Sequence, residues 1–224
     1  MAALAAPEAE YVQPAVTADT VLFSVRGGEL VALTVQRDRE PFLGWWALPG
    51  DYIRAEETLD DCAARALAEQ TGLDAIYLEQ LYTFASHYPG RWGRVFNVAY
   101  FALVPFAAVT PHAETGIAWQ ALSRLPRLAF NHEEILASAR RRLAAKVEYS
   151  SLALGLLPET FTLAEVQAVY EAIKGERLDK RNFRRYLLAL GHLETTGEKR
   201  QTGPHRPAML YRLSTPAAAK IVRR

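Results

Sequence analysis

Residues 50–73, GDYIRAEETLDDCAARALAEQTGL, constrain the fold of this chain more than any other stretch. Thr58, with Asp61 three residues later, is typical of a helix N-cap, and Gly72 suits the left-handed residue that ends a helix. Between these caps the apolar residues recur at helical spacing and so form one apolar face. A helix with a single apolar face has to pack against another layer of the protein.

The segments on either side of this helix alternate strands with one further helix. β-Branched and aromatic residues predict strands at 16–25, 29–36, 75–84 and 94–104, a hairpin turn at 26–28, and a short strand or turn at GIAWQAL. Loops are expected at RDREPFLGWWALPG and ASHYPGRWGR, and a long helix at 131–149. Two helices flanking a mixed sheet predict an α/β/α sandwich over residues 16–149, after a disordered N-terminal segment at 1–15.

Residues 150–224 have a different character. The run FTLAEVQAVYEAIKG carries a capping box, Thr162 with Glu165, and ends in a glycine. LDKRNFRRYLLALG predicts a second helix capped by Asp179, and the apolar run SSLALGLLP predicts a short helix before both. HLETTGEKRQTGPHRPAMLYRL then alternates short strands around a turn. Three helices followed by a β-hairpin predict a winged helix-turn-helix domain at 150–224.

The charge differs between these two parts. Residues 1–150 hold 13 basic and 18 acidic residues, a net −5, whereas residues 151–224 hold 13 and 7, a net +6. The basic part favours a polyanionic partner such as DNA, with a merely solvated basic face as the alternative. Cys62 is the only cysteine, so an intrachain disulfide and a cysteine zinc cluster are excluded. Without a long apolar run or a signal-peptide pattern, we expect no membrane partner and a cytoplasmic protein.

The helix within residues 50–73 presents a face that could bind a metal ion. Positions 66, 69 and 70 share this face, and acids there would hold Mg²⁺ by oxygen ligation and activate a pyrophosphate. The sequence places Ala66, Glu69 and Gln70 at these positions. We therefore expect no required cofactor, and only weak Mg²⁺ binding, through Glu57 and Glu69 if through any residues.

In its spacing this stretch resembles a Nudix box. With the first glutamate of the pattern on Glu57, the register fits without a gap and matches Arg65, Leu67, Glu69, Gly72 and Leu73. It departs at Asp51, where a glycine is expected, and at Ala66 and Gln70, where acids are expected. The resemblance implies the Nudix fold and a pyrophosphate-binding cleft. The lost acids predict a protein that is not an enzyme, with at most weak residual pyrophosphohydrolase activity.

The resemblance extends beyond the box to nearly the whole chain. WWALPG, YLEQLYTF, RVFNVAYFALV, LPRLAFNHEEIL, LLPETFTLAEVQAVYEAIKGERLDKRNFRRYLL and GPHRPAMLYRL together resemble the Nudix-related transcriptional regulators of the NrtR family. The resemblance implies a repressor of NAD-biosynthesis or salvage genes that senses ADP-ribose or a related nucleotide; some related regulators sense sugars. The alternative function is a Nudix hydrolase of ADP-ribose or another nucleoside diphosphate derivative.

A nucleoside diphosphate sugar needs cations for its phosphates, aromatic faces for its base and polar groups for its ribose hydroxyls. The candidate ligand-binding residues are Arg37, Trp46, Arg65, Glu69, Tyr88, Arg91, Trp92 and Arg94. Arg65 has a competing structural role, because it can pair with Glu69 four residues later on the helix.

Basic side chains gather on the second helix of the winged-helix part and on its wing. The candidate DNA-binding residues are Lys180, Arg181, Asn182, Arg184, Arg185, Lys199, Arg200 and Arg206. Arginine and asparagine can read bases in the major groove, and a wing can reach a minor groove or the backbone. One winged helix covers only a short half-site, so we expect a homodimer on palindromic double-stranded DNA. A winged helix that binds only proteins is the third alternative.

Overall fold

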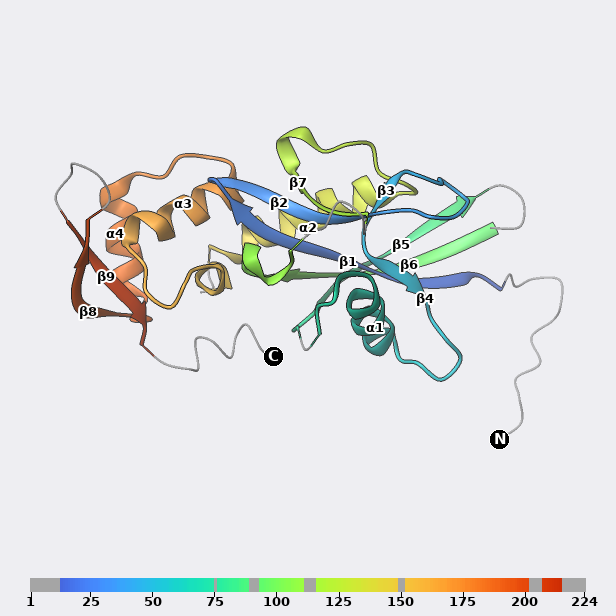
Figure 1. The fold of residues 1–224 in the computed structure, drawn as a ribbon, viewed down its shortest axis with the longest axis horizontal. Coiled ribbons are helices and arrows are strands. Elements are labelled where there is room, and N and C mark those ends of the chain that lie inside the picture. Colours follow the sequence, from blue (N-terminus) through green and yellow to red (C-terminus); the bar gives the residue numbers. More distant parts are fainter. Residues whose placement is uncertain are drawn as a thin grey trace.

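The computed structural model describes residues 13–74, 76–88, 93–110, 116–148, 152–201 and 207–214. An elongated molecule places a sandwich around a large sheet at one end and a smaller helical part with a two-stranded ribbon at the other (Figure 1). No helix in the described ranges is long and apolar enough to cross a membrane.

The large sheet has seven strands and mixes parallel with antiparallel pairing. Its strands are β1 (Ala15–Arg26), β2 (Glu29–Gln36), β3 (Trp46–Ala47), β4 (Gly50–Tyr52), β5 (Glu79–Tyr88), β6 (Gly93–Leu103) and β7 (Ile117–Ala121). The order is β3-β2-β1-β6-β5; β4 also pairs with β1, and β7 with β2. β1 and β6 are parallel, and every other pairing in this sheet is antiparallel.

Successive side chains of β1 and β6 point to opposite faces of the sheet, and a different helix covers each face. Ala18 and Tyr100 pack with α1 (Leu59–Thr71) on one face. Val21 and Phe101 pack with α2 (His132–Lys146) on the other. Successive strand residues point to opposite faces, so a run that is apolar throughout can bury both faces. The expected α/β/α sandwich is confirmed.

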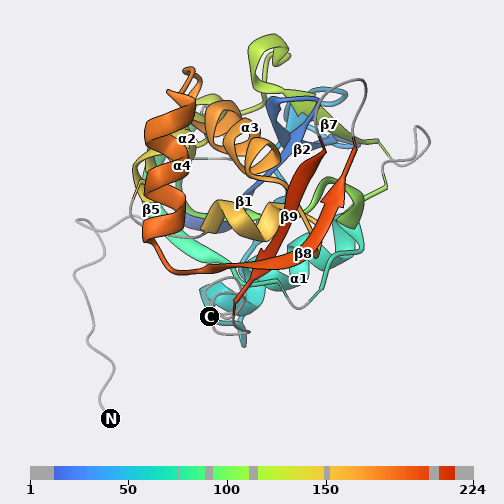
Figure 2. The ribbon, with the colours of Figure 1, turned by 90° about the vertical axis from the view of Figure 1, so that its left-hand side faces the viewer.

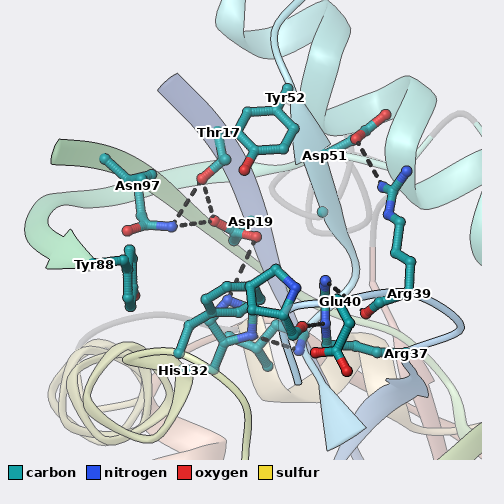
Figure 3. Close-up of a pocket in the computed structure, with 15 residues that line it drawn as sticks. Thr17, Asp19, Arg37, Arg39, Glu40, Asp51, Tyr52, Tyr88, Asn97 and His132 are labelled. Atoms are coloured by element: carbon teal, nitrogen blue, oxygen red, sulfur yellow. Dashed lines mark hydrogen bonds and ion pairs between the residues drawn. The ribbon is translucent and has the colours of Figure 1, made fainter. Parts of the chain in front are cut away.

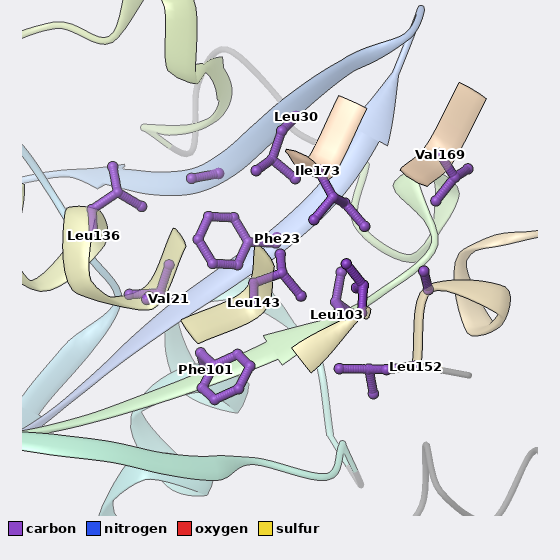
Figure 4. Close-up of a cluster of buried hydrophobic side chains, with 14 of the residues drawn as sticks. Val21, Phe23, Leu30, Phe101, Leu103, Leu136, Leu143, Leu152, Val169 and Ile173 are labelled. Atoms are coloured by element: carbon purple, nitrogen blue, oxygen red, sulfur yellow. The ribbon is translucent and has the colours of Figure 1, made fainter. Parts of the chain in front are cut away.

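The core on the α2 face continues into the smaller part of the molecule. Phe23 of β1 and Leu30 of β2 belong to the same buried cluster as Ile173 of α3 (Leu163–Lys174) and Leu187 of α4 (Lys180–Ala189). Figure 4 shows Ile173 beside Phe23 and Leu30. The two parts therefore share one hydrophobic core rather than meeting at a polar linker.

The C-terminal part has the predicted winged-helix elements. After the 3₁₀ helix η5 (Leu152–Leu156) come α3, α4 and the antiparallel ribbon of β8 (Leu193–Arg200) and β9 (Ala208–Leu213), which lie together at one end of the molecule (Figure 2). The capping box at Thr162 and Glu165 is formed, and Asp179 accepts a hydrogen bond from the Asn182 amide as the N-cap of α4. Two further 3₁₀ turns, η2 (Phe106–Ala108) and η4 (Leu122–Arg124), flank β7.

Some strand and loop boundaries predicted from the sequence were wrong. The strand predicted at 75–84 begins at Glu79 and runs on to Tyr88, because residues of the expected loop pair with β6 across the hairpin. The loop predicted before the capped helix contains the short strands β3 and β4, whose pairing depends on distant partners in β1 and β2. The segment expected to be disordered falls mainly outside the described residues, and β1 already includes Ala15.

Candidate functional site

A cavity of about 180 Å³ opens on the α2 face of the sheet, at the ends of β1 and β6 that lie away from the winged helix. Its lining residues come from β1, the β2–β3 loop, the β3–β4 connection, β4, β5, β6 and the start of α2: Thr17, Asp19, Arg37, Arg39, Glu40, Pro41, Leu48, Gly50, Asp51, Tyr52, Tyr88, Val95, Asn97, Phe130 and His132. Whole small-ligand sites are typically roughly 300–1,000 Å³. The enclosed part of this cavity therefore suits one end of a nucleotide sugar.

A polar network forms one side of the cavity, where Thr17, Asp19 and Asn97 lie together (Figure 3). The Asn97 amide Nδ2 donates to Thr17 Oγ1 at 2.8 Å and to Asp19 Oδ2 at 2.9 Å, and Thr17 Oγ1 donates to the same carboxylate oxygen at 2.7 Å. Both amide hydrogens are thus committed, which fixes the amide orientation. Asn97 Oδ1 is buried and has no hydrogen-bond partner among the described residues. On this side of the cavity the Asp19 carboxylate can accept a hydrogen bond from a donor such as a sugar hydroxyl.

His132, the first residue of α2, lies against this network. Its Nδ1 accepts a hydrogen bond from the Leu48 amide at 2.9 Å, which leaves the proton of the neutral ring on Nε2. Nε2 is 3.7 Å from Asp19 Oδ1. Burial lowers the pKa of His132, against the opposing effect of the Asp19 charge. The imidazole is therefore neutral at pH 7 and presents an N–H toward Asp19.

Two arginines from the β2–β3 loop form the cationic side of the cavity. The Arg37 guanidinium donates to the Pro41 carbonyl at 2.7 Å and lies 4.6 Å from the centroid of the Phe130 ring. Burial, together with the charge of Arg39, lowers the pKa of Arg37. Arg39 itself is exposed and lies 3.5 Å from Asp51. An anion between these two guanidinium groups would relieve their repulsion, so this side suits a phosphate.

Arg65 of α1 draws the acids of the box into ion pairs. It binds Glu57 through two bonds and lies 3.1 Å from carboxylate oxygens of both Asp51 and Glu69. The hydrogen bond from Arg65 lowers the pKa of Glu57 to about 2, and the same contact raises the pKa of Arg65. The alternative structural role of Arg65 is therefore realised, with three acids rather than Glu69 alone.

The positions that lack acids have structural roles of their own. Ala66 is buried at 1% exposure on α1, where a carboxylate would be costly without a partner. Gln70 makes two hydrogen bonds with the backbone of Gly50. The described residues contain no group of three or more side chains able to hold a metal ion. Because Glu57 and Glu69 are both paired with Arg65, the donor set does not fit Mg²⁺.

The structure brings together only some of the predicted ligand-binding residues. Arg37 and Tyr88 line the cavity, whereas Arg65 and Glu69 sit behind its β4 wall in the ion-pair network. Trp46 packs against the main core and Arg94 is exposed on β6, so neither lines the cavity. Arg91 and Trp92 lie outside the described residues.

Sequence reasoning missed the polar network itself. Thr17 and Asp19 stand two residues apart in β1, most of whose residues are buried, and Asn97 interrupts the apolar run of β6. Polar residues at buried strand positions carry a cost unless they are hydrogen-bonded, so this interruption was the available signal. Tyr52, Phe130 and His132 carried no comparable signal, because only the tertiary fold brings them to the cavity.

The predicted DNA-binding residues divide into exposed and anchored groups. Lys180, Arg181, Asn182, Arg184 and Arg185 are all exposed on α4, as is Lys199 on the wing. Arg184 and Lys199 line a groove of about 530 Å³ beside the start of α3. Arg200 instead donates to Glu165 at 2.8 Å and to the Thr160 carbonyl, so it ties the wing to α3. Arg206 lies outside the described residues.

Known proteins match both parts of the chain. The family model described as NUDIX domain matches residues 13–139, and the one described as NrtR DNA-binding winged helix domain matches residues 153–213. The ADPR responsive transcriptional repressor NtrR of Acinetobacter baylyi is 38% identical over 215 residues, which cover 92% of this chain and 85% of the relative. This chain belongs to the NrtR family of Nudix-related transcriptional regulators.

Solved structures of NrtR proteins have the same architecture. Shewanella oneidensis NrtR in complex with a 27mer DNA is 36% identical, with a TM-score of 0.78 over 91% of this chain and 95% of that one. The Nudix domain of the same NrtR in complex with ADP-ribose is 33% identical, with a TM-score of 0.53 over 62% of this chain and 94% of that one. The sequence-based family assignment and the fold, a Nudix sandwich followed by a winged helix, are both confirmed.

Proposed function

We propose that this chain is a transcriptional repressor that binds operator DNA through residues 150–224 and ADP-ribose or a related nucleotide through residues 16–149. The observation that carries the proposal is the match along almost the whole chain to an ADPR responsive repressor. The chain has both required parts, a polar cavity with a cationic side and a winged helix with an exposed basic helix. We further propose that it acts as a homodimer on palindromic DNA and regulates genes of NAD biosynthesis or salvage.

The chemistry of the cavity suits the terminal ribose and the diphosphate of such a ligand. The Asp19 carboxylate would receive hydrogen bonds from ribose hydroxyls, and Arg37 and Arg39 would hold the diphosphate. The Phe130 ring, which already contacts Arg37 and Tyr88, would offer an aromatic face to the remaining part of the ligand.

The basic face of α4 is proposed as the DNA-reading element. In a winged helix-turn-helix the second helix enters the major groove, and here that helix begins at Lys180 after the Asp179 cap. The groove that contains Arg184 and Lys199 lies at the α3 N-terminus, where backbone amides and the helix dipole favour a phosphate. Because Arg200 is already paired with Glu165, we propose for it a role in holding the wing.

Helix α2 provides a physical link between cavity and DNA-binding part. It begins at His132 in the cavity wall. Two residues beyond the other end of α2, the Glu148 carboxylate lies 3.3 Å from Lys174 of α3. The backbone carbonyl of Glu148 accepts a hydrogen bond from the Tyr186 hydroxyl of α4 at 2.9 Å. A ligand that shifts the His132 end of this helix would therefore move the contacts of the recognition helix. Coupling requires the ligand to bind the two arrangements with different affinity.

We also propose that the cavity senses its ligand without hydrolysing it. Support comes from the missing acids at Ala66 and Gln70 and from the pairing of Glu57 and Glu69 with Arg65. Incubating the full chain with ADP-ribose and Mg²⁺ should release no AMP above the rate of a heat-inactivated sample. Release at ordinary enzyme turnover rates, on the order of 1 s⁻¹ or more, would establish the hydrolase alternative instead.

DNA binding is tested first by selecting fragments from randomised duplex DNA with the full chain. We expect a palindromic consensus whose affinity falls steeply as the salt concentration rises. Arg184→Ala is the test variant, and Arg124→Ala is the matched control, because Arg124 is exposed and lies on the sandwich. Equal loss in both variants, or no consensus, contradicts DNA recognition through α4.

A further inference from the structure

We infer that Gln70 joins α1 to β4 by a neutral bridge in place of a cation, so that the cavity is shaped without a metal ion. The Gln70 amide Nε2 donates to the Gly50 carbonyl at 2.8 Å, and the Gly50 amide donates to Gln70 Oε1 at 3.2 Å. The two bonds run in opposite directions between the same two groups. Only a side chain with both a donor and an acceptor can form this bridge.

The bridge holds a wall of the cavity. Gly50, Asp51 and Tyr52 form β4, and all three line the cavity. Gly50 pairs with Asp19 of β1, and a Cβ at Gly50 would clash with Asp19 Oδ1. The position of Gly50 therefore determines how closely β4 approaches the Asp19 carboxylate. Gln70 fixes that position from the α1 side, although its side chain does not line the cavity.

A carboxylate at position 70 would make the contact with the Gly50 carbonyl repulsive. It keeps an acceptor for the Gly50 amide but loses the donor to the Gly50 carbonyl, so two oxygens would face each other at hydrogen-bonding distance. A hard cation between them would remove that repulsion. In the present chain the nearby acids Asp51, Glu57 and Glu69 are all paired with Arg65. Two further arginines add positive charge, because Arg39 pairs with Asp51 and Arg54 with Glu69. The amide at position 70 and these three arginines thus make a cation unnecessary.

The test compares thermal unfolding of the full-length wild type, Gln70→Glu and Gln70→Ala in EDTA and in MgCl₂, without any nucleotide. In EDTA both variants should unfold roughly 2–4 °C below the wild type, since each loses at least one partly buried hydrogen bond. Mg²⁺ should raise the Tm of Gln70→Glu alone. Gln70→Ala is the matched control, because it removes the bridge without adding a charge.

Two responses to Mg²⁺ in the unfolding test would overturn the inference. One is a Mg²⁺-dependent rise in the Tm of the wild type. The other is a Gln70→Glu protein that Mg²⁺ does not stabilise. Should Gln70→Glu fail to fold, the wild type and Gln70→Ala still decide the matter, because a Tm of Gln70→Ala equal to that of the wild type contradicts the bridge.

A second arm uses calorimetric binding of ADP-ribose and rests on the proposed function. The wild type should bind with the same affinity in EDTA and in Mg²⁺, and Gln70→Ala should bind roughly tenfold more weakly in both, the equivalent of one to two net hydrogen bonds. Wild-type binding that requires Mg²⁺ overturns the inference and leaves the proposed function intact. Absence of wild-type binding in both buffers contradicts the ADP-ribose assignment, whereas the unfolding arm still decides the role of Gln70.

Discussion

The continuous core predicts that the sandwich and the winged helix unfold together. Ile173 of α3 is fully buried and belongs to the cluster that contains Phe23 and Leu30 of the sheet (Figure 4). Replacing a buried isoleucine by alanine removes apolar contacts and leaves a cavity, at a cost of roughly 2–5 kcal/mol. Taking about 3 kcal/mol, and about 2–4 °C of Tm per kcal/mol for a chain of this size, Ile173→Ala should lower the Tm by about 6–12 °C.

Differential scanning calorimetry on the full chain measures this directly. We expect one transition in the wild type and one in Ile173→Ala, shifted as a whole. Leu188→Ala is the matched control, because Leu188 is 45% exposed on α4 and its truncation should change the free energy of unfolding by less than about 0.5 kcal/mol. Two separate transitions, with only one shifted by Ile173→Ala, would refute the shared core as the link between the two parts.

Three further predictions concern the cavity and the DNA-binding helix. Asp19→Asn removes a charged acceptor and should weaken ADP-ribose binding by roughly ten- to hundredfold in calorimetry, whereas unchanged affinity contradicts the proposed pose. The lowered pKa of His132 means that the unfolded chain takes up a proton first as pH falls, so the free energy of unfolding should decline below about pH 6.5 and stay flat above it. That decline, up to about 1.4 kcal/mol per pH unit, should be absent from His132→Asn in denaturant titrations at several pH values. Lys180→Ala should weaken binding to all DNA sequences alike and reduce the slope of log affinity against log salt by about one, as measured by fluorescence anisotropy; a selective loss at one base pair would instead assign Lys180 to base reading.

Local sequence signals were sufficient for the elements that depend on local interactions. The caps at Thr58, Thr162 and Asp179 each bond a backbone amide three residues away, so sequence spacing alone locates them. Strands β3 and β4 were missed because each is very short and is defined by partners elsewhere in the sheet. Helix α4 was located correctly because its cap is local. The course of the β5–β6 hairpin was not, because it depends on pairing between strands.

The cavity was predicted less completely than the fold. A search for cations and aromatic rings found Arg37 and Tyr88, which do line the cavity, but also selected Trp46, which packs into the core. Residue type does not reveal which face of a strand meets the cavity, since that depends on the sheet as a whole. Asp19 and Asn97 could have been found by asking why an acid and an amide stand in strands that are buried on both faces.

The role of Gln70 shows a different limit of sequence reasoning. From the pattern alone, this residue is a lost acid of the Nudix box. The structure shows both polar atoms of its amide bonded to Gly50, which no spacing rule would reveal because the two residues meet only after β4 pairs with β1. The amide at position 70 therefore supports two proposals of this account, one on the absence of hydrolysis and one on the shape of the cavity.

The most direct test of the central claim is the affinity of the full chain for its selected palindromic DNA, measured with and without saturating ADP-ribose. A sensor linked to the recognition helix through α2 should change that affinity at least about fivefold, the lower end of typical allosteric coupling. Asp19→Asn should need correspondingly more ADP-ribose to produce the change, while its affinity for DNA without ligand stays as in the wild type. Tight, sequence-selective DNA binding that ADP-ribose leaves unaltered would contradict the account.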